Sequence, residues 1–445
     1  MGSRPLVRSM LALAALLAGV SACTSGGQTA SSKVTLEGPC GTKKDATVTV
    51  GLFGTFGFQE NGMWKEYKKR CPNITIKQNQ VTASGDYWTR LKTRLASGSG
   101  LDDVVAIEQG FVADVVQNHA DEFVNMQTVP QAAALKKDYY GWKWKQATTP
   151  DGKSTVGLGT DIGPEAICYR SDLLDKAGMG ATPEELAQKW TTWDSFIKFG
   201  KQYKAATNGK AFLDSAQSVF STAVYQGKRA YSDEQGQPDL EHSDGVKTAW
   251  KYATQAAEAG ITAKLAQFSD AWNQAFSSGK FAAIACPTWM MPYIQSQAGP
   301  AYAGKWAVAP GLPGGYSNWG GSFLGVPAAA DQKAAAVALV TWLSEKDQQV
   351  KMWTSKAQGG HFPSNDKAVQ DPAVADATSA YFSDAPVGQI FGGIAGKMKT
   401  LPPVGIYDTQ IGTVLSTQLS NVEKRGTDPD KAYAKAMDQI QQITG

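Results

Sequence analysis

The stretch of residues 47–107 alternates strand and helix signals, and this alternation limits the fold more than any other feature of the chain. Residues 47–53 (TVTVGLF) are rich in β-branched side chains, and residues 103–107 (DVVAI) form a second apolar run. Between them, Ile74 and Ile76 alternate as in a strand, and residues 87–95 carry apolar side chains at helical spacing. Strands that alternate with helices predict an α/β fold with a largely parallel sheet.

The first 23 residues predict the compartment in which the chain folds. Arg4 and Arg8 precede the uncharged run of residues 10–20, and small residues follow it up to Cys23. This order is typical of a secretory signal, and the apolar run is too short to span a bilayer. Residues 20–23 (VSAC) resemble the lipobox of bacterial lipoproteins, which implies a signal peptide over residues 1–22, lipid on Cys23 and a tether over residues 23–45. The alternative is an ordinary secretory signal with a chance cysteine.

Length and charge narrow the classes of protein further. The 445 residues are too many for one hydrophobic core, so we expect two lobes. The formal net charge of +3 includes Arg4 and Arg8, so the chain without its signal is close to neutral. Near neutrality argues against a nucleic-acid partner, which would favour a basic surface.

Four cysteines remain when Cys23 is set aside, and in an oxidising compartment an even number suggests disulfides. Three connectivities are possible. We favour Cys40 with Cys71 and Cys168 with Cys286, because each pair falls within one expected lobe. None of the four has the spacing of a CxxC zinc or redox site, and no metal site or cofactor is expected.

Aromatic residues are abundant, with 13 Trp, 15 Tyr and 16 Phe. Trp and Tyr present flat apolar faces together with hydrogen-bonding groups, a combination that suits carbohydrate recognition. Most of these rings are expected in the core, and Trp193, at the start of a predicted helix, is one of them. The polar loop 232–245 contains four acidic residues without the spacing of an EF-hand, so we interpret it as solvated surface.

An ordered set of segments resembles the extracellular solute-binding proteins of bacterial ABC importers, in the carbohydrate-binding family that includes maltose-binding protein. The matching segments are LASGSGLDDVV (95–105), AICYRSDLLDKAG (166–178), TTWDSF (191–196), GKFAAIACPTW (279–289), NWGGSFLGVP (318–327) and GGHFPSN (359–365). Where relatives often carry Asn-Gly before the Pro-Trp pair, this chain has Ala285-Cys286-Pro287-Thr288-Trp289. A disulfide at Cys286 would stiffen that loop.

The resemblance implies a two-lobed fold of the periplasmic-binding-protein type (type II), with a ligand cleft between lobes that close by hinge motion. Its expected parts are lobe 1 (46–159 and 325–361), lobe 2 (165–318 and 370–445) and three crossing segments (160–164, 319–324 and 362–369).

The same resemblance implies ligand contacts. Trp289 and Trp319 would stack on sugar rings, and Asp161, in the first crossing, would accept hydrogen bonds from sugar hydroxyls. Asp161 could instead form a hinge salt bridge or cap a helix. Further candidates follow strands or lie near crossings: Phe56, Glu108, Gln109 and His361.

These features lead to the hypothesis of a surface lipoprotein that captures a mono- or oligosaccharide and delivers it to an ABC permease, without covalent chemistry. We expect a monomer held at the outer face of the cell membrane by Cys23. One alternative is a glycosidase with Asp161 and Glu165 as its carboxylate pair, although no GxSxG or HExxH motif is present. Another is an adhesin or a receptor for a non-sugar solute, because a fold alone does not determine a ligand.

Overall fold

The structure, a computed structural model, describes residues 34–355 and 360–445. The expected signal peptide (1–22) and the expected lipid-bearing Cys23 lie outside the described residues. Within the described ranges, every helix is too short or too polar to cross a membrane.

A five-stranded sheet has the strand order β2-β1-β3-β9-β4. Its strands are β1 (Ala46–Phe53), β2 (Ile74–Val81), β3 (Val104–Glu108), β4 (Gly157–Gly159) and β9 (Ser322–Gly325). β1 pairs in parallel with β2 and β3, whereas β9 runs antiparallel to β3 and β4. The alternation of strand and helix predicted for residues 47–107 is confirmed, and β9 is the strand of reversed direction.

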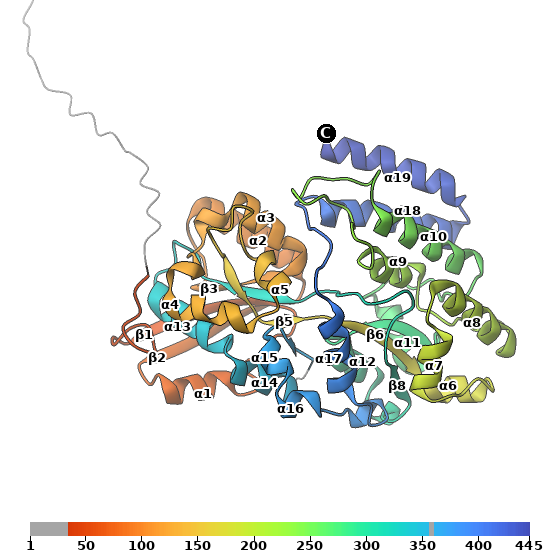
Figure 1. The fold of residues 1–445 in the computed structure, drawn as a ribbon, viewed down its shortest axis with the longest axis horizontal. Helices are drawn as coiled ribbons and strands as arrows, with labels where there is room; N and C mark the ends of the chain where they lie inside the picture. Colours follow the sequence, from red (N-terminus) through yellow and green to blue (C-terminus); the bar gives the residue numbers. More distant parts are fainter. Residues whose placement is uncertain (1–33, 356–359) are drawn as a thin grey trace, which may run out of the picture. The chain divides into compact units, whose positions relative to one another are not determined.

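Helices cover both faces of this sheet because successive side chains of β3 point to opposite sides. Val104 and Ala106 share an apolar cluster with α1 (Met63–Arg70) and α13 (Lys333–Leu343). Val105 and Ile107 pack instead with α2 (Ser84–Ser97) and α3 (Gln109–Asn118), which lie together near β3 (Figure 1). A strand that is buried on both faces therefore ends directly at the start of α3.

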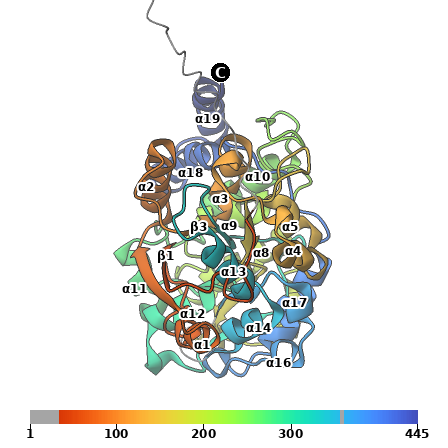
Figure 2. The ribbon, with the colours of Figure 1, turned by 90° about the vertical axis from the view of Figure 1, so that its left-hand side faces the viewer.

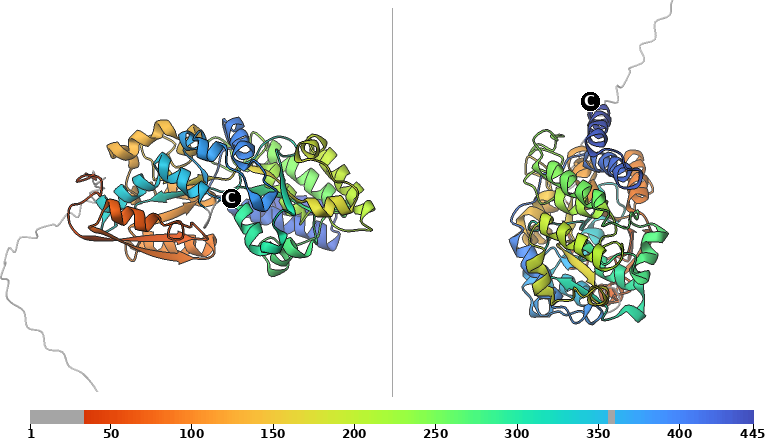
Figure 3. Two further views of the ribbon diagram at one scale, coloured as in Figure 1. Left: turned by 90° about the horizontal axis from the view of Figure 1, so that it is seen from below. Right: turned by 90° about the vertical axis from the view of Figure 1, so that its right-hand side faces the viewer.

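A second sheet has the order β7-β6-β8 with antiparallel pairing throughout. Its strands are β6 (Glu165–Arg170), β7 (Ala283–Pro287) and β8 (Trp306–Ala309). One face packs on α8 (Trp193–Ala206), α9 (Ala216–Val224) and α10 (Asp244–Glu258), whose green ribbons lie together in Figure 3. The other face packs on α11 (Asp270–Ser278), α12 (Met290–Ala298) and α17 (Val387–Lys397). Trp193 is buried in the first of these clusters, as predicted.

The C-terminal helices α18 (Asp408–Arg425) and α19 (Pro429–Thr444) pack on each other, and α18 also packs on α9 and α10 (Figure 2). The remaining α-helices are α4 (Pro130–Ala133), α5 (Gly141–Gln146), α6 (Ser171–Lys176), α7 (Pro183–Lys189), α14 (Lys346–Thr354), α15 (Asp366–Val369) and α16 (Pro372–Ala375). Short 3-10 turns occupy Ala120–Glu122, Met126–Thr128, Ala134–Asp138, Pro300–Tyr302 and Ala380–Phe382.

The three expected crossing segments lie next to one another. β5 (Asp161–Ile162) pairs antiparallel with β10 (Phe362–Pro363), and the Trp319 N–H donates a hydrogen bond to the Gly163 carbonyl (2.9 Å). The apolar clusters do not follow the expected lobe boundaries everywhere, because Trp142 and Trp353 pack in the cluster of the second sheet.

Both expected disulfides form, Cys40 with Cys71 and Cys168 with Cys286. The second disulfide joins the neighbouring strands β6 and β7. The pairing favoured on the sequence is therefore confirmed.

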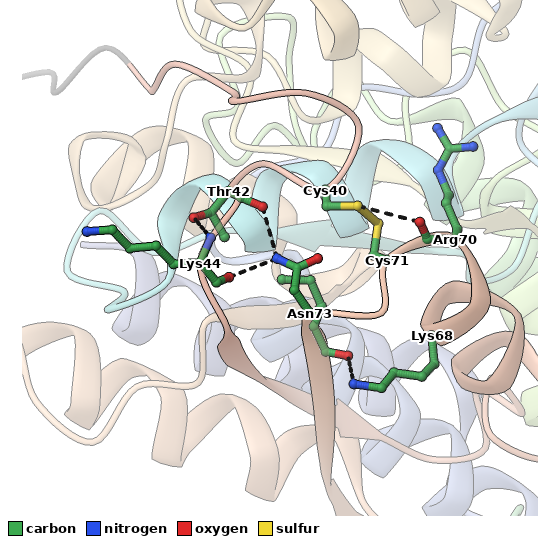
Figure 4. The surroundings of a disulfide bond; sticks show 8 residues. Cys40, Thr42, Lys44, Lys68, Arg70, Cys71 and Asn73 are labelled. Atoms are coloured by element: carbon green, nitrogen blue, oxygen red, sulfur yellow. Dashed lines mark hydrogen bonds between the residues drawn. A yellow bond between two sulfur atoms is a disulfide. The ribbon is translucent and has the colours of Figure 1, made fainter.

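The segment just before β1 packs on the first sheet. Val34 is buried, and Asn73 donates hydrogen bonds through Nδ2 to the carbonyl oxygens of Thr42 (3.0 Å) and Lys44 (2.8 Å), beside the Cys40 disulfide (Figure 4). Residues 34–45, which we expected in the tether, thus belong to the packed part of the chain.

Candidate functional site

A cavity of about 680 Å³ is lined by five parts of the chain: the start of α3, the loop 318–320, residues of α9 and the segment after it, Val404, and one face of α18. Its volume lies within the range of about 300–1,000 Å³ typical of small-molecule sites. The wall is rich in hydroxyl and amide groups, so it suits a ligand with many hydrogen-bonding groups.

Glu108 and Gln109 line this cavity where β3 passes into α3. The side-chain oxygen of Gln109 accepts a hydrogen bond from Asn318 Nδ2 (2.8 Å), and its backbone N–H donates to the carbonyl of Gly321 (3.0 Å). Burial raises the pKa of Glu108, against the opposing effects of the Gly110 N–H and the Lys143 ammonium. Two predicted contact residues thus lie on the wall, and Gln109 is held by Asn318 and by Gly321 of the second crossing.

Trp319 also lines the cavity and belongs to a group of aromatic rings. Trp289 donates a hydrogen bond from Nε1 to the Trp319 carbonyl (2.8 Å), and the two rings meet edge to face at 5.1 Å. Phe268 lies roughly parallel to Trp289 at 6.3 Å and remains 52% exposed. Its φ of 64° is unusual for a residue with a side chain, so the backbone holds this ring out at an energetic cost.

The other predicted contacts lie outside the residues that line the cavity. Asp161 is only 6% exposed, and its Oδ1 accepts hydrogen bonds from the Ser322 N–H (2.9 Å) and the Thr160 hydroxyl (2.7 Å). Phe56 is buried and stacks on His361 at 6.1 Å. Asp161 therefore links the first crossing to the second through hydrogen bonds. This is close to the hinge role that Sequence analysis gave as an alternative to ligand binding.

Sequence analysis did not identify Lys143 as a residue near the site. It is fully buried on α5, and its Nζ has no hydrogen-bond partner among the described residues. The ammonium lies 3.7 Å from the centre of the Phe323 ring, and burial lowers the pKa of Lys143 to about 7, although the Asp161 and Glu108 carboxylates oppose this shift. A lysine in a Trp-rich run (GWKWKQ) is expected at the surface, and only the tertiary fold buries it.

Asp408, Tyr225 and Tyr231 were also missed, and all three line the cavity. Asp408 accepts a hydrogen bond at Oδ1 from the Ser232 hydroxyl (2.5 Å), and burial raises the pKa of Asp408 to about 6. A usable signal was present, because hydroxyl residues recur every four positions at Thr409, Thr413 and Thr417. Such a repeat marks one polar face of a helix.

The carboxylate pair weighed for a glycosidase is not arranged for catalysis. Glu165 is fully buried, and its Oε1 accepts a hydrogen bond from the Thr222 hydroxyl (3.0 Å). Burial raises the pKa of Glu165 to about 7, but the side chain does not line the cavity. Among the described residues, no group of three or more His, Cys, Asp or Glu side chains could hold a metal ion.

Comparison with known proteins shows the family to which this chain belongs. A sequence profile of bacterial extracellular solute-binding proteins matches residues 62–381. A lactose-binding protein of Rhizobium radiobacter is 27% identical over 394 residues, which cover 84% of this chain and 87% of that protein.

Solved structures show the same fold. The crystal structure of an extracellular solute-binding protein of family 1 has a TM-score of 0.81 and 34% identity, over 90% of this chain and 100% of that chain. An ABC-transporter-associated binding protein of B. animalis subsp. lactis, solved with β-1,6-galactobiose, has a TM-score of 0.71 and 19% identity, over 89% and 97% of the two chains. The maltose-bound MalE3 of T. maritima has a TM-score of 0.68 and 18% identity, over 89% and 99%.

The family is one of binding proteins that act outside the cytoplasm, and its fold has two lobes. With a profile match over most of its length, this chain belongs to the family of bacterial extracellular solute-binding proteins.

Proposed function

We propose that this chain is the substrate-binding lipoprotein of an ABC importer and that it captures a sugar or oligosaccharide in the cavity beside Trp319 and α18. The observation that carries the proposal is the composition of the cavity wall, where Trp319 and two tyrosines stand among hydroxyl, amide and carboxylate groups. Aromatic faces supply apolar contact to the C–H face of a sugar, and the polar groups fix its hydroxyls.

What the similar proteins bind supports a carbohydrate. The protein of Rhizobium radiobacter is named a lactose-binding protein, and two structures with the same fold were solved with β-1,6-galactobiose and with maltose. The disaccharides of these three proteins differ in units and linkage, so they define a first panel of probes for this chain.

The N-terminal segment supports delivery of the sugar to a permease in the cell membrane. Lipid on Cys23 would hold the protein at the outer face of the cell membrane as a monomer. Ligand-driven closure of the two lobes would then create the form that the permease subunits recognise. The other predicted contacts, Asp161, Trp289, Phe56 and His361, remain proposals as residues that shape the site around Trp319.

The test is a fluorescence titration of the soluble chain from Thr24 onward with lactose, β-1,6-galactobiose and maltose. We expect saturable binding of at least one sugar, and the Trp319→Ala variant to bind it at least tenfold more weakly, about 1.4 kcal/mol. Trp64→Ala is the matched control, because Trp64 is a half-buried tryptophan on α1 that does not line the cavity. Equal affinities for wild type and Trp319→Ala would remove the cavity from the proposal.

A further inference from the structure

Helix α18 forms one long wall of the cavity. Asp408 at its first position and Arg425 at its last both line the cavity. At 1.5 Å per residue, these two positions are about 25 Å apart along the helix axis. A pyranose ring spans about one helical turn, roughly 5 Å, so a single sugar unit would contact only a small part of this wall.

Three threonine hydroxyl groups on this wall are arranged as hydrogen-bond acceptors. Thr409 donates its hydroxyl hydrogen to the Gly110 carbonyl (3.1 Å), and Thr413 and Thr417 donate theirs to backbone carbonyls one turn earlier (2.8 Å each). Each of these oxygens still has lone pairs available to a ligand. The wall therefore suits a ligand that donates hydrogen bonds, as neutral sugars do through their hydroxyls.

Asp408 adds a charged acceptor at the N-terminal end of the wall. The residue is 4% exposed, and its Oδ2 is buried without a hydrogen bond from any residue that the structure describes. Burial raises the pKa of Asp408 to about 6, so the carboxylate is mainly ionised at neutral pH. A buried carboxylate oxygen without a donor is destabilising, and a ligand hydroxyl would relieve that cost through a charge-assisted hydrogen bond.

A second carboxylate on the wall, that of Glu108, also favours a neutral ligand over an acidic one. Glu108 lines the cavity just before α3, and the hydrogen bond between Thr409 and Gly110 brings the start of α18 to the start of α3. An acidic unit at this end of the wall would meet both Glu108 and Asp408, far from Arg425 at the other end, and like charges at close range oppose binding. A neutral ligand avoids this repulsion.

We propose that the cavity binds a neutral oligosaccharide of three or more units laid along α18, and that Asp408 accepts a hydrogen bond from a hydroxyl of its end unit. This inference rests on the proposed function, because it assumes that the ligand is a carbohydrate. It adds the length and charge of that ligand and a contact residue that the sequence did not indicate.

The test compares ligands of increasing length by calorimetric titration. The probes are maltose, maltotriose and maltotetraose, and the β-1,6-linked galactose series of two to four units. We expect the Kd of the series that binds to fall at least tenfold from two to four units. Asp408→Asn is expected to weaken binding of the four-unit ligand at least tenfold, because the charged acceptor is lost.

Thr413→Trp and Gln410→Trp form a matched pair on α18. Both positions are exposed, but only Thr413 lines the cavity, so a bulky ring there blocks the wall and the ring at Gln410 does not. We expect the gain in affinity with length to disappear in Thr413→Trp and to persist in Gln410→Trp, with melting temperatures of both variants close to wild type.

The outcomes separate the two proposals. Binding with the same affinity at two and four units, or an unchanged length dependence in Thr413→Trp, would overturn the inference and leave sugar capture standing. No binding of any probe by folded protein would contradict the proposed function. It would also contradict the inference about the length and charge of the ligand.

Discussion

Glu165 illustrates how burial alone sets the chemistry of a side chain in this protein. Its carboxyl group is fully buried beside Thr222 and Ser317, and desolvation raises the pKa of Glu165 to about 7 from an ordinary value of 4.5. The folded state therefore holds this proton up to higher pH than the unfolded state does. Stability contributed by the protonated form is present below about pH 4.5 and is lost as pH rises towards 7.

Glu165→Gln is expected to remove this pH dependence. At pH 8 the variant should be more stable than wild type by on the order of 2–3 kcal/mol, because no buried charge remains, whereas at pH 5 the two should be nearly equal. Urea unfolding at both pH values measures the difference. Glu184→Gln, at an exposed site on α7, serves as the control. A Glu165→Gln variant that is less stable than wild type at pH 8 would show that the charge is compensated.

Some site residues could be predicted because they follow strands. Glu108 and Gln109 come directly after the apolar run 103–107, whereas Trp319, before the two glycines that lead into β9, was predicted from the family resemblance. Asp408 and Tyr231 could not be found in this way, since they reach the cavity through the packing of α18 and the loop before α10. Lys143 is the extreme case, because nothing in its local sequence distinguishes a buried ammonium from a solvated one.

At the scale of elements, the crossing at β9 depends on a close approach of backbones. Gly321 has a φ of 105°, and a Cβ placed there would lie 2.7 Å from the Asp161 carbonyl oxygen and 3.0 Å from Lys143 Nζ. A side chain at this position would be both strained and crowded. The glycine at position 321 thus allows β5, β9 and α5 to approach one another closely.

Gly321→Ala is accordingly expected to lower the free energy of unfolding by roughly 2 kcal/mol or more. Gly393→Ala is the opposite case, because Gly393 lies within α17 and an added Cβ would meet nothing within 4 Å. That change should raise stability by roughly 0.5–1 kcal/mol through helix propensity. Chemical denaturation of both variants measures the contrast, and equal effects would mean that β9 tolerates a shift in its backbone.

Element prediction succeeded where periodicity was strong and failed where long-range packing decides. The strands around 47–53 and 103–107 were expected from β-branched and apolar runs, and α2 from the helical spacing of apolar residues within 87–95. The reversed direction of β9 could not be predicted from its own sequence, because strand direction depends on how the chain returns to the first sheet.

For the whole molecule, the chain length and the order of the matching segments were enough to predict the two-lobed fold. Two sheets with separate apolar clusters agree with the two lobes expected from 445 residues, and the crossings lie side by side at β5 and β10. The fold does not choose the ligand, so the claim of sugar capture depends on the chemistry of the cavity wall.

Isothermal titration calorimetry of the soluble chain with lactose, with β-1,6-galactobiose and maltose, and with the four-unit members of the last two series tests that claim most directly. We predict one-to-one saturable heat with at least one of these sugars, together with a raised melting temperature at saturating ligand. The absence of heat with every sugar, from protein that circular dichroism shows to be folded, would contradict the account.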